Sequence, residues 1–135
     1  MLADDSGLAI DVLNGAPGIY SARFAGDNAG YPEKIARLHE LLKPWPPEEW
    51  LASFICVMAL VRPDGRTELT RGECRGLISP EMKGSEGFGY DPIFYLPGLK
   101  KTMAQLPPAE KHKFSHRGQA LRAMAAILLR ELNGR

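Results

Sequence analysis

Hydrophobic residues occupy nearly every position of one stretch of the chain, from Leu51 to Val61. A strand whose two alternating sets of side chains are both apolar is typical of a central strand covered on both faces. Pro63-Asp64-Gly65 follows as a hairpin signal, and the next run, Thr67 to Ile78, is more polar and is interrupted by two glycines. The pattern therefore predicts a β-hairpin whose second strand lies nearer the edge of a sheet.

Helical spacing appears in two other stretches of the chain. Pro32 fits the first turn of one helix. The apolar stripe of this helix comprises Ile35, Leu38, Leu41 and Leu42. Ser115 fits the N-cap of a last helix that ends at Asn133-Gly134. A short strand at residues 93–96 and a helical turn at residues 100–106 are expected before it.

The first residues of the chain combine a strand pattern with two acids. Residues 2–3 fit the end of a buried strand, with Asp4 and Asp5 at its tip. Ser6-Gly7 then predicts a turn before an alternating run at residues 8–12. Adjacent carboxylates suit Mg²⁺, which binds one or two carboxylates together with substrate phosphates, and a spare carboxylate can take a proton from water. The same string is also ordinary turn chemistry, so both interpretations stay open at this point.

Residues 84–92 form a glycine-rich passage that leads into the expected short strand. Its glycines let the backbone approach a ligand closely, and Phe88 and Tyr90 offer flat faces on which a nucleobase can stack. Such stacking contributes about 1–3 kcal/mol per base at single-stranded nucleic acid sites. The passage matches neither a Walker nor a Rossmann pattern. A turn that places its aromatic residues in the core is the alternative interpretation.

Positive charge gathers at the expected start of the last helix. Lys111, His112 and Lys113 precede it, and His116 and Arg117 stand in its first turn. A helix start attracts anions through its free N–H groups and its dipole. The same dipole disfavours a cation in the first turn, so we expect Arg117 to have another partner. A helix cap flanked by solvated bases is the alternative.

Composition limits the classes of function that the chain can serve. Its 135 residues suit one domain, placed at residues 1–135, and its 17 basic and 16 acidic residues give a net charge of +1. Such a balance provides no overall field toward nucleic acid or an anionic membrane. The longest apolar runs are too short to cross a bilayer, and the acidic opening does not fit a signal peptide. We expect a cytoplasmic protein in which Cys56 and Cys74 are buried thiols.

Four motifs in order resemble the inosine/xanthosine triphosphate pyrophosphatase family, which removes deaminated purine nucleotides. They span Ala3 to Leu8, Ala16 to Arg23, Gly87 to Pro92 and Ser115 to Gly118. The resemblance implies an α/β fold with an elongated mixed β-sheet flanked by helices. It also implies a cleft for Mg²⁺ and a purine nucleoside triphosphate, hydrolysis to the monophosphate and pyrophosphate, and a homodimer.

The resemblance also assigns roles to individual residues. Asp5 matches the family's metal-binding proton acceptor, and Ser6 matches a substrate contact. The base pocket corresponds to Phe88, Gly89, Tyr90 and Asp91, and further substrate contacts correspond to Lys111, His116 and Arg117. A guanidinium only donates hydrogen bonds, so Arg117 is expected to favour a purine with an O6 acceptor over adenine.

The chain departs from the family at its beginning. The family normally begins with a strand, a Ser/Thr-Gly-Asn-x-x-Lys loop that holds the triphosphate, and a glutamate that shares the metal. These features do not occur in the 135 residues, so we expect a domain shortened by about its N-terminal third. The alternative function is a catalytically impaired nucleotide-binding or dimerisation remnant of the same fold. A related pyrophosphatase acting on modified pyrimidines is a third possibility.

Overall fold

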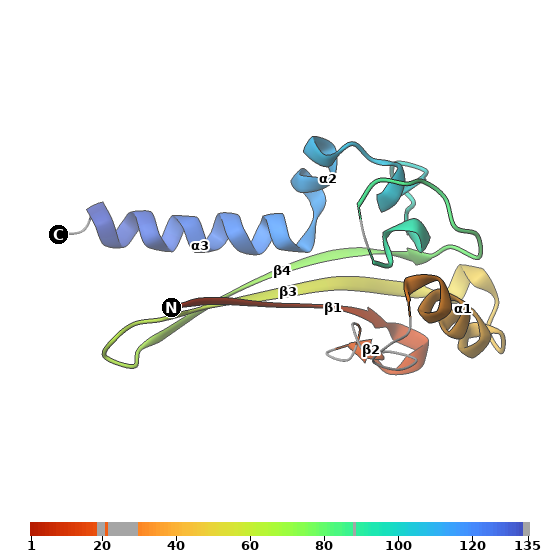
Figure 1. Ribbon diagram of the computed structural model, residues 1–135, viewed down its shortest axis with the longest axis horizontal. Coiled ribbons are helices and arrows are strands. Elements are labelled where there is room, and N and C mark those ends of the chain that lie inside the picture. The colour runs from red at the N-terminus through yellow and green to blue at the C-terminus, as the bar shows by residue number, and fades with distance from the viewer. Residues whose placement is uncertain (19–20, 22–29, 88, 134–135) are drawn as a thin grey trace.

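The computed structural model describes residues 1–18, 21, 30–87 and 89–133 of the chain. Six strands form one sheet in the order β2-β1-β3-β4-β5-β6, and every pairing between them is antiparallel. The strands are β1 (Leu2–Ile10), β2 (Pro17–Gly18), β3 (Leu51–Val61), β4 (Thr67–Ile78), β5 (Phe94–Leu96) and β6 (Lys101–Thr102). The long strands β1, β3 and β4 give the molecule the predicted elongated α/β form (Figure 1).

The predicted hairpin is confirmed with its predicted bounds. β3 and β4 pair along their whole length, from Leu51 opposite Leu77 to Val61 opposite Thr67. β4 joins β5 only through Leu77 and Ile78, so most of its outer edge pairs with no described strand. This arrangement agrees with the predicted position of β4 nearer an edge.

β1 is a continuous strand, and the turn predicted at Ser6-Gly7 is wrong. Nine successive residues of β1 pair with β3, from Leu2 opposite Leu60 to Ile10 opposite Ala52. The cross-strand pairing overrides the local turn preference of Asp-Asp-Ser-Gly, because strand formation depends more on context than on intrinsic propensity. Asp4 and Asp5 therefore lie within a strand and not at its tip, and their side chains project to opposite faces of the sheet.

One face of the sheet carries the core. Its buried residues include Leu8, Ile10, Ala52, Phe54, Cys74 and Ile78, and α1 (Tyr31–Leu42) adds Ile35, Leu38 and Leu42. β3 is a central strand, as predicted, but on its other face Ile55, Val57 and Ala59 are only half-buried, so that face is less covered than the core face. Cys56 and Cys74 are buried free thiols, as predicted. None of the described helices is long and apolar enough to cross a membrane.

α2 (Pro108–Phe114) and α3 (His116–Asn133) complete the fold. The predicted Ser115 cap is confirmed, because its hydroxyl accepts a hydrogen bond of 3.0 Å from the Gly118 N–H. α3 runs along β3 and β4 toward the turn that joins them (Figure 1). Its buried contacts, Ala120 and Met124, pack on Cys56 and Met58 of β3.

The short elements before α2 differ from their predicted bounds. The expected strand at residues 93–96 begins one residue later, because residues 91–93 form the 3₁₀ turn η3 (Asp91–Ile93). The expected helical turn at residues 100–106 splits into β6 and the 3₁₀ turn η4 (Met103–Gln105). A capping box between Thr102 and Gln105 ends the strand and starts this turn. Two further 3₁₀ turns are η1 (Asp11–Leu13) and η2 (Pro47–Glu49).

Gly72 allows α3 to lie directly on β4, and its replacement by alanine should destabilise the fold. A Cβ atom there would collide with the His116 carbonyl oxygen and lie 2.8 Å from the Ala120 nitrogen. Because both neighbours are backbone atoms, Gly72→Ala should lower the free energy of unfolding by about 1–3 kcal/mol. Urea denaturation measures this change. The control is Gly98→Ala, whose Cβ would meet no atom within 4 Å; equal stability of the two variants would contradict the packing argument.

Candidate active site

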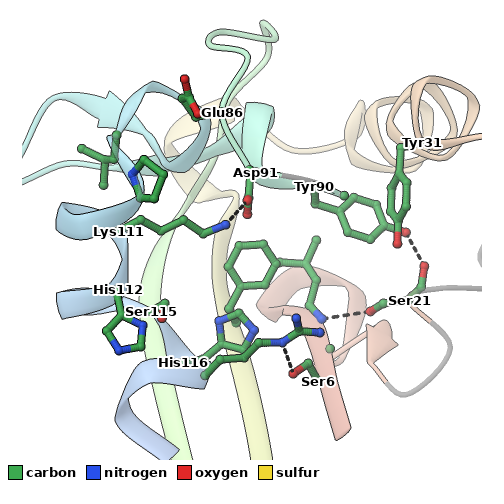
Figure 2. Close-up of a pocket in the computed structure, with 18 residues that line it drawn as sticks. Ser6, Ser21, Tyr31, Glu86, Tyr90, Asp91, Lys111, His112, Ser115 and His116 are labelled. Atoms are coloured by element: carbon green, nitrogen blue, oxygen red, sulfur yellow. Dashed lines mark hydrogen bonds and ion pairs between the residues drawn. The ribbon is translucent and has the colours of Figure 1, made fainter. Parts of the chain in front are cut away.

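A cavity of about 380 Å³ lies between β1, the glycine-rich segment, α2 and the start of α3 (Figure 2). Most of the predicted substrate-contacting residues line it, namely Ser6, Gly89, Tyr90, Asp91, Lys111, His116 and Arg117. These residues come from segments more than 100 positions apart in the sequence, and the fold brings them together. Phe88 lies outside the described residues, so its predicted place in the base pocket stays a prediction.

Arg117 links the first turn of α3 to β1. Its Nε–H donates a hydrogen bond of 3.1 Å to the Ser6 hydroxyl. This bond supplies the partner that the sequence led us to expect for a cation in a helix's first turn. Two residues predicted as substrate contacts, both lining the cavity, therefore form a hydrogen bond with each other.

His116 occupies an apolar environment on the same wall. Its imidazole stacks on Phe54, with ring centroids 4.9 Å apart and planes 21° from parallel. Burial lowers the pKa of His116 to about 4, and the positive charges of Arg117 and Lys111 act in the same direction. The side chain is thus neutral near pH 7, with one nitrogen as donor and the other as acceptor. Within the described part of the chain, its buried Nδ1 has no hydrogen-bond partner.

Lys111 and Asp91 form an ion pair beside the cavity. The Lys111 Nζ lies 2.5 Å from the Asp91 Oδ2, and the whole Asp91 residue is only 5% exposed. The pairing offsets the cost of burying the carboxylate. Gly87 has a φ of +79°, and a side chain there would overlap the Asp91 carboxylate and lie 2.9 Å from the Lys111 Nζ. A side chain at Gly87 would therefore strain the backbone and displace this ion pair.

Tyr90 and Ser21 connect the glycine-rich segment to β1. The Tyr90 hydroxyl donates to the Ser21 carbonyl oxygen at 2.7 Å, and the Leu8 N–H donates to the Ser21 hydroxyl at 2.9 Å. Burial raises the pKa of Tyr90, so this hydroxyl stays protonated and keeps donating. Sequence reasoning missed Ser21 as a site residue, although it lies inside the motif from Ala16 to Arg23. It also missed Tyr31 and Phe54, because nothing near them in sequence marks them as cavity residues.

Asp5 does not line the main cavity. It lies at a smaller hollow of about 140 Å³ with Ile55 and Val57, and the two hollows share Ser6 and Gly7. The described residues contain no cluster of three or more histidine, cysteine or acidic side chains that could enclose a metal ion. At the smaller hollow Asp5 offers one carboxylate, which is a hard oxygen donor. Such a donor fits Mg²⁺ when phosphate oxygens and water complete the coordination, which is a common way for proteins to bind this ion.

Comparison with known proteins places this arrangement in a family. The model of the Ham1 family matches residues 1–127. The chain belongs to the Ham1 family. This Ham1-family chain is 49% identical over 129 residues to a dITP/XTP pyrophosphatase of Desulforamulus reducens, covering 96% of the chain and 64% of the relative. It is 50% identical to the Yersinia pseudotuberculosis protein of the same name, covering 94% of the chain and 66% of that relative.

Solved structures of Ham1 proteins share the fold. The chain matches a HAM1 protein from Coxiella burnetii with a TM-score of 0.90 and 46% identity, covering 95% of the chain and 66% of that protein. It matches the Staphylococcus aureus Ham1 protein with a TM-score of 0.90 and 45% identity, covering 96% of the chain and 67% of that protein. The chain thus spans roughly two thirds of the length of its Ham1 relatives, and the predicted family and fold are confirmed.

The titration of His116 provides a test of the cavity's electrostatics. An NMR titration should give His116 a pKa of about 4 against the ordinary 6.5, so the imidazole stays neutral through the physiological range. The unfolded chain then binds more protons between these two values, and this group makes the protein less stable as the pH falls from about 6.5 to 4. Arg117→Met should raise the pKa only in part, because burial is the largest cause. A titration near 6.5 in the folded protein would show that His116 is solvated.

Proposed function

We propose that this chain carries the function of a deaminated-purine nucleoside triphosphate pyrophosphatase. The substrates would be inosine and xanthosine triphosphates and their deoxy forms, hydrolysed to the monophosphate and pyrophosphate with Mg²⁺. The observation that carries the proposal is the meeting of Ser6, Arg117 and the Lys111–Asp91 pair in one cavity. The proposal is further supported by relatives 48–50% identical that bear the name dITP/XTP pyrophosphatase.

Base selection would rest on hydrogen-bond polarity. Arg117 presents only donors, which suit the O6 acceptor of hypoxanthine or xanthine and oppose the 6-amino group of adenine. Neutral His116 would contribute its Nε2 beside it, because its Nδ1 is buried. Phe88, Gly89, Tyr90 and Asp91 would form the remainder of the base pocket. A site that leaves buried donors unpaired before the wrong base can discriminate by a factor of about 10⁴.

Phosphate chemistry would take place at Ser6 and Gly7, although Asp5 and Ser6 project to opposite faces of β1. Ser6 and Gly7 line both, so a nucleotide whose base fills the larger cavity would lead its phosphates toward Asp5. Mg²⁺ bound by Asp5 and phosphate oxygens would neutralise charge on the triphosphate. Asp5 would also orient the attacking water and accept its proton, and Lys111 would place a cation near the substrate.

A homodimer working in the cytoplasm is part of the same proposal. α3 exposes four leucines, with exposed fractions between 37% and 69%: Leu121 in its first half and Leu128, Leu129 and Leu132 in its second half. Such apolar surface is typical of an interface when it is contiguous. Two buried free cysteines agree with a reducing compartment.

A second candidate is a nucleotide-binding or dimerisation remnant that does not turn its ligand over. The placement of Asp5 outside the main cavity favours it, since the base-binding residues could keep their ligand without a catalytic carboxylate. Pyrophosphate release from inosine triphosphate with Mg²⁺ separates the two candidates. Selective binding without release would support the remnant.

Replacing Arg117 should weaken base discrimination. Arg117→Met removes the donors proposed to face O6, so the ratio of affinities for inosine and adenosine triphosphates should fall about tenfold or more. Isothermal titration calorimetry of both nucleotides measures this ratio. Arg130→Met makes the same substitution at an exposed position of α3 and should leave the ratio unchanged. A ratio that survives Arg117→Met would contradict the proposed reading of the base.

Replacing Asp5 should affect turnover more than replacing its neighbour. Asp5→Asn weakens a metal ligand and removes a base, so pyrophosphate release should fall by about 10²-fold or more. Asp4→Asn is the matched control, because Asp4 projects to the opposite face of β1 and should matter less. Equal losses in the two variants would refute the assignment of a single catalytic carboxylate.

A further inference from the structure

Tyr31 lines the cavity although it belongs to none of the four sequence motifs. It stands in the first turn of α1 and is half-buried. Figure 2 shows its ring against that of Tyr90, away from Lys111. The two rings meet edge to face, with centroids 5.1 Å apart and an interplanar angle of 89°. Edge-to-face contact is one of the preferred geometries for aromatic pairs.

The same ring also packs beside the backbone of Gly89. A Cβ atom placed on Gly89 would lie 3.5 Å from Cε1 and Cζ of Tyr31, so the ring occupies the space beside this residue. Gly89 has a φ of +66° and no side chain with which to anchor itself. Described hydrogen bonds hold the segment on either side, from the Glu86 N–H to the Ala104 carbonyl and from the Tyr90 hydroxyl to Ser21. Tyr31 fills the interval between these two anchors.

Tyr31 also contacts a residue of its own helix, α1. The Nζ of Lys34 lies 4.3 Å from the centroid of its ring, which is a cation–π geometry, and the whole Lys34 residue is 5% exposed. Ile35 and Leu38, on the next turns of α1, are buried in the main core. The ring therefore belongs to a helix that the core holds in place. Its contacts with Gly89 and Tyr90 restrain the glycine-rich segment.

We propose that Tyr31 is a positioning residue that holds Gly89 and Tyr90 in the shape required to bind the purine base. The proposal rests on the proposed function for the identity of the ligand, but the contacts themselves do not depend on it. Because Tyr31 braces the base end of the cavity, its loss should weaken binding of the base and leave binding of the phosphates unchanged. The hydroxyl is not required for either ring contact, so phenylalanine should substitute for tyrosine.

The first measurement is amide hydrogen exchange of the ligand-free protein. Tyr31→Leu should make the amides of Gly89 and Tyr90 exchange about tenfold faster or more, whereas Tyr31→Phe should leave them within about twofold of the wild type. Trp45→Leu is the matched control, since Trp45 is a half-buried aromatic residue just beyond the other end of α1. It should destabilise the helix without changing exchange at Gly89 and Tyr90. Equal effects of Tyr31→Leu and Trp45→Leu at these amides would overturn the proposal.

The second measurement compares two probes by isothermal titration calorimetry. Tyr31→Leu should weaken binding of inosine 5′-monophosphate about tenfold, equivalent to about 1.4 kcal/mol, and should leave binding of tripolyphosphate within about twofold. Tyr31→Phe should restore the affinity for the monophosphate. If the variant loses affinity for both probes equally, or for neither, Tyr31 does not position the base pocket. If the wild-type chain binds neither probe, the proposed function fails, and hydrogen exchange alone decides whether Tyr31 positions the segment.

Discussion

The antiparallel ladder between β1 and β3 is the constraint on which the site depends. Nine consecutive residue pairs between the two strands determine the face of the sheet from which each side chain of β1 projects. In that register Ser6 and Leu8 project toward the helices, and Asp5 projects to the other side. A shift of one residue would exchange the two sets and remove Ser6 from the reach of Arg117. The division between a base cavity and a separate carboxylate therefore follows from strand register.

Close approach of α3 to β4 provides the second half of the site. Gly72 leaves room for the helix backbone, so the first turn of α3 can bring His116 over Phe54 and Arg117 to Ser6. At the far end, Arg62 beside the hairpin turn forms an ion pair with Glu131 of α3. Both contacts keep the helix aligned with the hairpin. The position of its first turn is therefore set by contacts along the whole sheet.

Electrostatics within the cavity follow from burial. His116 loses its charge because an imidazolium would be poorly solvated against Phe54 and close to other cations. Asp91 keeps a cationic partner in Lys111. Tyr90 remains a donor, since burial opposes its ionisation. The cavity thus combines apolar walls with a few hydrogen-bonding groups, which is the usual chemistry of a small-molecule site.

The sequence by itself determined the β3–β4 hairpin, the helix after Pro32 and the Ser115 cap, because periodicity, turn residues and capping act over a few neighbouring positions. It also identified the family and seven of the residues that line the cavity, six of which lie in the motifs. Tertiary structure alone decided that Asp-Asp-Ser-Gly runs straight through β1, because pairing with β3 outweighs local turn preference. It likewise decided that Asp5 and Ser6 face different hollows and that Tyr31 borders the cavity. These are contacts between distant segments, and no local pattern encodes which residue will stand opposite another.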